Sequence, residues 1–156
     1  MKGISIIYFI IIPVIALIDQ LAKAAALHYL GDGKDLTVVK DCIHFVIVKN
    51  YGAAFSILKG KQLLLKCITV PLILLLLCYL FHIFAGEDYS VLNKLSLSFI
   101  IGGAIGNLID RIRLNYVVDY VRLNIRKFPV FNLADVFILI GSFMFIVYTF
   151  DQYTIF

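Results

Sequence analysis

Hydrophobic residues fall into four long runs along the chain, separated by more polar segments. The runs are Ile4–Leu27, Leu63–Ala85, Leu95–Ile112 and Leu133–Phe150. Each is close to the roughly 20 residues that a helix needs to cross the hydrocarbon core of a bilayer. Helices suit this task because they satisfy their backbone hydrogen bonds internally. The pattern therefore predicts four transmembrane helices, and residues 1–156 are expected to form a single integral membrane domain.

Two of the connecting segments have patterns of their own. In residues 31–61, Ile43, Phe45 and Ile47 alternate with His44, Val46 and Val48, as in a strand. We therefore expect a small β-element here, beside the membrane. The last connection, residues 113–130, reads as a short amphipathic segment. The predicted fold class is an all-α membrane protein with four transmembrane helices, a small β-element and this amphipathic segment.

Composition agrees with a membrane protein and excludes several other classes. The chain is 62% hydrophobic and 15% charged, with a mean hydropathy of +0.99, whereas soluble domains are about half apolar and about a quarter charged. No basic patch with interleaved aromatic residues points to nucleic acid as a partner. The three histidines are dispersed and lack the spacing of a zinc site. We therefore predict no metal and no cofactor.

Four spans bring polar residues from distant parts of the sequence to one membrane surface. The first and last connections must lie on the same side, and both termini and the middle connection, residues 86–93, on the other. Ten candidate site residues then share one surface: Asp19, Lys23, Asn50, Gly52, Asn107, Asp110, Arg111, Asp119, Asn132 and Asp135. The opposite surface carries ordinary loop charges such as Glu87, Asp88 and Lys94.

Two acids stand out because of their surroundings. Asp135 lies at the start of the fourth apolar run, and Asp119 lies within the apolar sequence Val117–Val121. A charged side chain at the bilayer centre costs roughly 2.5 to 3.5 kcal/mol on insertion scales, so such an acid marks a functional site by default. Two carboxylates that share a site indicate acid–base chemistry.

Structural explanations compete for the remaining polar residues. Asp19 and Lys23 are four residues apart on one helix face, which suits a structural ion pair. Asn107 and Asn132 suit hydrogen bonds between transmembrane helices. Asp110 can form a structural charge pair with Arg111, its neighbour in the sequence.

The glycines of the third run have a simpler explanation. Gly102, Gly103 and Gly106 follow no predicted strand and lie in an apolar segment. We therefore interpret them as positions of close helix packing and not as a phosphate-binding loop.

Five short motifs occur in an order that identifies a resemblance. They are Asp19-Gln20-x-x-Lys23, Asn50-x-Gly52-Ala53-Ala54-Phe55, Gly103-Ala104-x-Gly106-Asn107-x-x-Asp110-Arg111, Val117-Val118-Asp119-Tyr120 and Phe128-Pro129-x-Phe131-Asn132-x-Ala134-Asp135. Each motif alone is weak. Together with the four-span layout, they make the chain resemble the lipoprotein signal peptidases, also called signal peptidase II, over nearly its whole length.

The resemblance implies a function and a role for each candidate residue. It implies an aspartic endopeptidase of the bacterial inner membrane that cuts diacylglyceryl-modified prolipoproteins just before the lipidated cysteine. Asp119 and Asp135 would form the catalytic pair. The supporting and substrate-binding residues would be Asn50, Gly52, Asn107, Arg111 and Asn132, and the structural residues Asp19, Lys23 and Asp110.

The expected partners follow from the same resemblance. They are prolipoprotein substrates, membrane lipid and inhibitors of the globomycin type, a cyclic depsipeptide that occupies the substrate site in the family. The resemblance also implies that residues 31–61 form an extracytoplasmic β-cradle that clasps the peptide. We expect a monomer with its active site at the extracytoplasmic face. The positive-inside rule opposes this orientation, because the site-bearing connections hold most of the Lys and Arg residues. The five motifs outweigh that tendency, and some of the charge can serve anionic lipid headgroups.

Two other classes of function would also place acids in a membrane protein. A small proton-coupled transporter would distribute polar residues through the membrane depth, whereas here the candidates gather at one surface. A structural assembly subunit would use Gly102, Gly103 and Gly106 for helix packing but leaves Asp119 and Asp135 unexplained. Essential acids without proteolysis would support the transporter, and dispensable acids would support the structural subunit.

Overall fold

The computed structural model describes residues 2–31, 33–52, 58–86 and 90–154. Its four helices are α1 (Lys2–Leu30), α2 (Gln62–Ala85), α3 (Val91–Arg113) and α4 (Leu133–Thr154). Each contains a stretch long and apolar enough to cross a membrane. The four predicted helices are therefore confirmed, with ends that extend a few residues into the polar flanks. Part of one motif, Ala53-Ala54-Phe55, and residues 87–89 of the middle connection lie outside the described residues.

A three-stranded antiparallel sheet accompanies the helices. Its strands are β1 (Asp35–Val39), β2 (Ile43–Asn50) and β3 (Val117–Leu123), in the order β1-β2-β3. The first two confirm the predicted β-cradle. The third comes from the last connection, for which the sequence analysis predicted amphipathic character but no strand. Its register with β2 pairs Val48 with Asp119 and Asn50 with Val117, so the sheet brings Asn50 close to Asp119.

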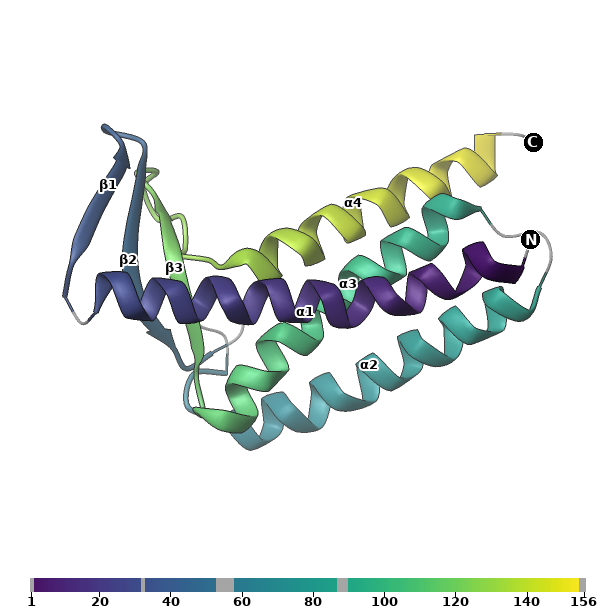
Figure 1. The fold of residues 1–156 in the computed structure, drawn as a ribbon, viewed down its shortest axis with the longest axis horizontal. Helices are drawn as coiled ribbons and strands as arrows, with labels where there is room; N and C mark the ends of the chain where they lie inside the picture. The colour runs from purple at the N-terminus through teal and green to yellow at the C-terminus, as the bar shows by residue number, and fades with distance from the viewer. Residues whose placement is uncertain (1, 32, 53–57, 87–89, 155–156) are drawn as a thin grey trace.

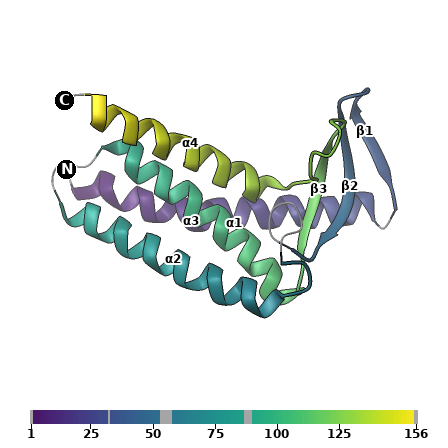
Figure 2. The same ribbon diagram turned by 180° about the vertical axis from the view of Figure 1, so that it is seen from behind.

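The sheet lies across one end of the helix bundle, and the Lys2 end of α1 and the Thr154 end of α4 lie at the other (Figures 1 and 2). This arrangement confirms that the first and last connections share one side. It also places the carboxyl end of α3 and the amino end of α4 beside β3. The candidate site residues are therefore gathered where the helices meet the sheet.

Close packing around α3 depends on its glycines. An added Cβ at Gly103 would lie 2.5 Å from the Ala134 carbonyl oxygen of α4. On the α1 side, one at Gly102 would lie 2.8 Å from Ile15. Small residues let membrane helices approach closely in this way. The predicted packing role of the glycines is confirmed.

A buried cation links α1 to α3 inside the bundle. The Lys23 ammonium is 2.8 Å from the Asp19 carboxylate and 3.0 Å from that of Asp110, and it donates to Asn107 Oδ1 at 3.0 Å. Lys23 is 2% exposed, Asp19 0% and Asp110 3%. The predicted Asp19–Lys23 pair is present. Asp110, for which the sequence suggested Arg111, pairs with Lys23 because α1 and α3 are in contact here.

Replacing Lys23 with Met is expected to destabilise the protein strongly. The substitution keeps a long apolar stem but leaves two buried carboxylates without their cation, and breaking a buried pair typically costs about 3–5 kcal/mol. Thermal unfolding in detergent should show a large fall in midpoint for Lys23→Met and little change for Lys59→Met, which removes an exposed cation. Adding Asp110→Asn to Lys23→Met should recover part of the loss. Equal midpoints for Lys23→Met and Lys59→Met would contradict this interpretation.

Candidate functional site

Asn132 and Asp135 cap the amino end of α4 through reciprocal hydrogen bonds. Asn132 precedes the helix, and its Oδ1 accepts a hydrogen bond from the Asp135 N–H at 3.0 Å. Asp135 returns the contact, because its Oδ2 accepts from the Asn132 N–H at 3.2 Å. This is the reciprocal pattern of a capping box, built here from Asn and Asp. The sequence Asn-x-x-Asp therefore fixes one site carboxylate by the same bonds that start the helix.

Asn107 connects this carboxylate to α3. Its amide nitrogen donates to Asp135 Oδ1 at 2.8 Å, and its Oδ1 accepts from Lys23 at 3.0 Å. The same Oδ1 accepts from the Asn132 side chain, also at 3.0 Å. Acceptance from Lys23, which can only donate, fixes which end of the Asn107 amide faces Asp135. The buried ion pair thus orients the hydrogen bond to the site.

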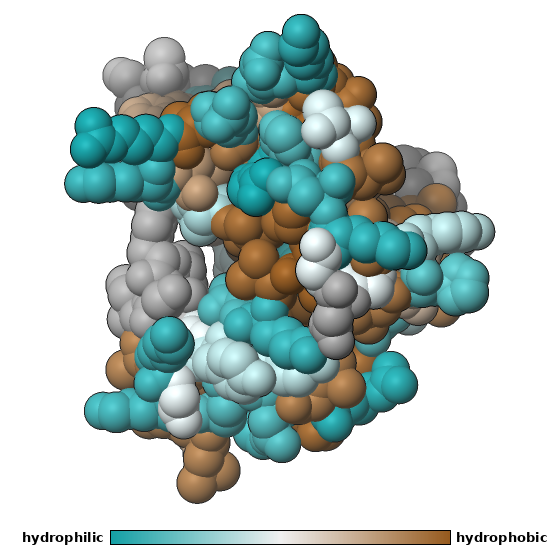
Figure 3. All heavy atoms as spheres, turned by 90° about the vertical axis from the view of Figure 1, so that its left-hand side faces the viewer, coloured by the Kyte–Doolittle hydropathy of each residue, from teal (hydrophilic) through white to brown (hydrophobic). Residues whose placement is uncertain are grey.

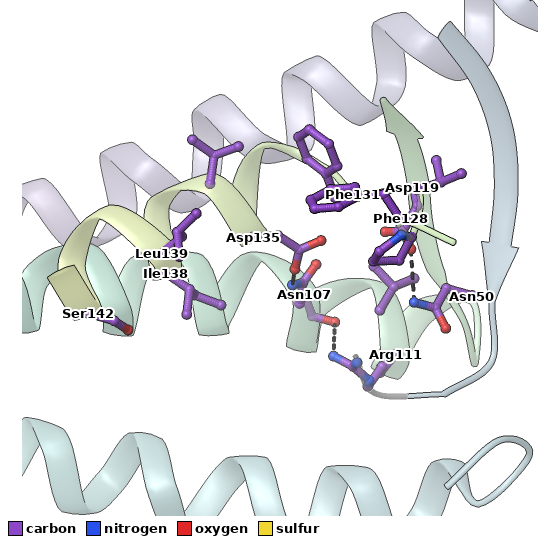
Figure 4. Close-up of a pocket in the computed structure, with 14 residues that line it drawn as sticks. Asn50, Asn107, Arg111, Asp119, Phe128, Phe131, Asp135, Ile138, Leu139 and Ser142 are labelled. Carbon is purple, nitrogen blue, oxygen red and sulfur yellow. Dashed lines mark hydrogen bonds between the residues drawn. The ribbon is translucent and has the colours of Figure 1, made fainter. Parts of the chain in front are cut away.

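Asp119 is held between two amides on neighbouring elements. The Asn132 amide donates to its Oδ1 at 2.7 Å, and the Asn50 amide of β2 donates to its Oδ2 at 2.8 Å. Asn132 therefore contacts both aspartates, and each aspartate accepts two N–H donors. Figure 4 shows the two acids reaching the same space, Asp119 from β3 and Asp135 from α4.

Burial changes the titration of Asp119. Its side chain is 2% exposed. The pKa of this carboxyl is raised to about 7, chiefly by loss of hydration and also by the negative charge of Asp135, while the amide donors Asn50 and Asn132 oppose the rise. Asp119 is therefore an acid that holds its proton close to neutral pH, as a group with a role in proton transfer requires.

The two carboxylates that pair with Lys23 also accept hydrogen bonds from the segments that carry Asp119 and Asp135. Asp19 accepts a hydrogen bond from the Ala134 N–H at 2.9 Å, one residue before Asp135. Asp110 accepts from the Val118 N–H at 3.0 Å, one residue before Asp119. The backbones of both acid-bearing segments are thus tied to the same buried cluster.

Arg111 extends across the site from the end of α3. Its guanidinium donates to the Asn107 carbonyl and to the Gly52 carbonyl, both at 3.3 Å. Its Nε is buried and has no hydrogen-bond partner among the described residues. Gly52 is held in turn by a bond from its N–H to Asn50 Oδ1 at 2.9 Å. Arg111 therefore presents an unused donor beside the two acids.

A pocket of about 420 Å³ opens over these groups. Its polar lining is Asn50, Asn107, Arg111, Asp119 and Asp135, and its apolar lining includes Phe128, Phe131, Ile138 and Leu139. Leu139 is 70% exposed on the outer side of α4. The pocket therefore passes from a polar floor onto the surface that α4 turns toward lipid.

The structure brings all ten predicted residues into one connected region. Five of them line the pocket, Gly52 and Asn132 are hydrogen-bonded to those five, and Asp19, Lys23 and Asp110 form the buried cluster that supports them. Sequence reasoning missed Gln20 as a participant, although its amide donates to Asp110 at 2.9 Å and to the Gly106 carbonyl at 3.1 Å. It also missed the apolar pocket wall of α4. Gln20 could have been found from its position in the first motif. The pocket wall could not, because lipid-facing and pocket-facing residues look alike in an apolar run.

Metal ligation has no obvious place in this region. Across the described residues, no three His, Cys, Asp or Glu side chains come together in a way that could hold a metal ion. The carboxylates of the site are instead occupied by amide, ammonium and backbone N–H donors.

Comparison with known proteins agrees with this geometry. The family model described as Signal peptidase (SPase) II matches residues 11–151. A lipoprotein signal peptidase of Clostridium tetani is 42% identical over 142 residues, covering 89% of each chain. One of Halothermothrix orenii is 42% identical over 144 residues, covering 92% of this chain and 95% of its own.

A solved structure of a bacterial membrane enzyme has the same fold. It superposes with a TM-score of 0.83 at 28% sequence identity, and the match covers 96% of this chain and 89% of that one. The family model, the two relatives and the shared fold span nearly the whole chain, from α1 to α4. This protein is a multi-pass membrane protease that belongs to the signal peptidase II family of bacterial lipoprotein signal peptidases.

Proposed function

We propose that the protein is an aspartic endopeptidase that removes the signal peptide from diacylglyceryl-modified prolipoproteins, cutting just before the lipidated cysteine. The observation that carries the proposal is the convergence of Asp119 and Asp135 on one pocket through the shared donor Asn132. Two carboxyls so linked divide the work of a general acid and a general base. No covalent intermediate is required.

The raised pKa of Asp119 supports placing the proton on this residue. Asp119 is the neutral acid and donates to the oxygen of the scissile carbonyl, while Asp135 takes a proton from a water molecule whose oxygen attacks the carbonyl carbon. The product is a neutral tetrahedral diol. Its collapse moves a proton from Asp135 to the leaving nitrogen and one from a diol hydroxyl back to Asp119. Both acids end in their starting states, so the cycle balances.

Other pocket residues supply binding. Arg111 lines the pocket, and its guanidinium is suited to donate to a substrate carbonyl. Asn50 holds Asp119 and, through Gly52, the start of the following loop. Inhibitors of the globomycin type would compete for the same pocket.

The shape of the pocket suits a lipid-bearing substrate. The acids lie at the polar end, and Ile138 and Leu139 continue the lining along α4. Acyl chains can therefore remain in lipid while the scissile bond sits at headgroup depth, where water is available. In the proposed orientation, the pocket is at the extracytoplasmic face of the inner membrane and a monomer suffices.

Asp119→Asn and Asp135→Asn are each expected to lower turnover by about 10² to 10⁴, the usual contribution of general acid–base catalysis. Signal-peptide release from a diacylglyceryl prolipoprotein, and from its unlipidated form, would be followed in detergent micelles. The wild type should cleave only the lipidated form. Asp151→Asn, an exposed acid near the far end of α4, should retain full activity. Near-normal turnover by Asp135→Asn would refute the catalytic pair.

Turnover should fall as pH rises through about 7, because Asp119 then loses the proton that it must donate. The Asn50 amide favours the ionised form of Asp119 and lowers its pKa. Asn50→Ala should therefore raise the Asp119 pKa and move the alkaline limb of the pH–rate profile to higher pH. A pH–rate profile of each protein on the lipidated substrate would measure the shift. An alkaline limb that moves to lower pH would contradict the assigned role of Asp119.

A further inference from the structure

One end of the sheet forms a projecting surface beside the pocket. We define the tip as the β1–β2 turn, residues 39–42, together with the loop of residues 124–128 after β3. The two parts are joined by hydrogen bonds from the Asn124 N–H to the Cys42 carbonyl at 2.8 Å and from the Asn124 amide to the Asp41 carbonyl at 3.3 Å. Each also closes a turn of its own, from the Cys42 N–H to the Val39 carbonyl and from the Phe128 N–H to the Ile125 carbonyl, both at 3.0 Å. The tip is therefore held together by its own hydrogen bonds.

The tip extends sideways past the start of α4. In Figures 1 and 2 the sheet runs across the helix ends, and the β1–β2 turn lies on the α4 side, outside the outline of the bundle. If the helices span the bilayer, this part of the sheet lies over the lipid next to α4. Phe128 belongs both to the tip and to the pocket lining. The tip thus borders the side of the pocket that opens toward lipid.

The tip combines cations with exposed apolar side chains. Lys40, Arg126 and Lys127 are exposed, and the structure gives none of them an ion-pair or hydrogen-bond partner within the described residues. Ile125, 59% exposed, and Phe128, 47% exposed, flank Arg126 and Lys127 in the sequence. Cations next to large apolar side chains are typical of segments that lie in a membrane interface. Figure 3, which faces the sheet, shows hydrophilic side chains projecting around apolar ones.

The charge of the tip is not neutralised nearby. Asp41 is the one acid among residues 39–42 and 124–128, against three cations. Asp35, an acid on β1, already pairs with Arg122 and with His44. More broadly, all but four of the 14 Lys and Arg residues lie at the sheet end of the molecule, the exceptions being Lys2 and Lys94 at the other end and Lys23 and Arg111 inside. The tip is therefore a local excess of positive charge within a positive face.

We propose that the tip binds anionic phospholipid headgroups, with Arg126, Lys127 and Lys40 in the headgroup layer and Ile125 and Phe128 inserted among the acyl chains. This contact holds the β3–α4 loop, and with it Phe128 at the pocket mouth, against the bilayer from which substrate enters. The inference rests on the proposed function for the depth of the pocket in the membrane. Binding to anionic lipid would also account for the positive charge on this face, which the positive-inside tendency disfavours.

A single fluorophore can test the proposal, because the chain has no tryptophan. Ile125→Trp would be placed in nanodiscs made of equal parts of phosphatidylcholine and phosphatidylglycerol. In one preparation the phosphatidylglycerol is brominated high on its acyl chains, and in the other the phosphatidylcholine is. Headgroup attraction of about fivefold for each Lys or Arg at the surface predicts clearly stronger quenching by brominated phosphatidylglycerol.

Matched variants identify the source of the preference. Adding Arg126→Gln and Lys127→Gln should make the two brominated lipids quench equally. Adding Lys59→Gln and Lys61→Gln, which removes the same charge from exposed positions at the same end, should leave the preference intact. Equal quenching with the native cations present, no quenching by either lipid, or a preference that survives Arg126→Gln with Lys127→Gln would overturn the proposal.

The assay is independent of catalysis. It needs no substrate and no turnover, so a negative result leaves the proposed peptidase activity standing. Conversely, an inactive wild type in the cleavage assay would leave a measured lipid preference standing. The two proposals can therefore fail separately.

Discussion

The fold and the site both depend on one buried ammonium group. Lys23 lies inside an apolar bundle, where an unpaired charge would be prohibitive, and its three donors meet Asp19, Asp110 and Asn107. Two of these acceptors pass the constraint on, because Asp19 and Asp110 hold backbone N–H groups next to the two site aspartates. A buried ion pair is a poor source of stability but a good means of fixing one arrangement. Here it fixes strand β3 and the start of α4, which carry the two site aspartates.

In the proposed function, the site meets two opposing demands at the membrane boundary. Acid–base chemistry on a peptide bond requires water and one protonated carboxyl, whereas a lipid-bearing substrate requires an apolar surface. Placing Asp119 on a strand and Asp135 at the first turn of a membrane helix meets both demands, because the strand supplies burial and the helix leads into lipid. Desolvation, which would be only a cost elsewhere, keeps Asp119 protonated near neutral pH.

Much of this was predictable because membranes impose strong rules. The hydropathy pattern predicted the four helices. Because successive membrane-spanning helices alternate in direction, the same pattern also placed ten polar residues at one membrane surface. β3 was not predicted, because Val117–Leu123 pairs with a strand more than 60 residues away and its local pattern fits several structures. The partner of Asp110 was assigned to Arg111 because sequence shows neighbours and not the contact between α1 and α3 that brings Lys23 close. Buried Ser98 also donates to the Tyr8 carbonyl of α1 at 2.9 Å, a contact between helices that an apolar pattern does not reveal.

The central claim is that Asp119 is the protonated member of the pair of acids near neutral pH. Infrared difference spectroscopy of the purified protein observes this proton directly, because a protonated carboxyl has a carbonyl stretch that a carboxylate lacks. The account predicts a band present below pH 7 that disappears as pH rises through about 7, and that is absent from Asp119→Asn at every pH. A spectrum without this band in the wild type, or a band that persists unchanged in Asp119→Asn, would contradict the account.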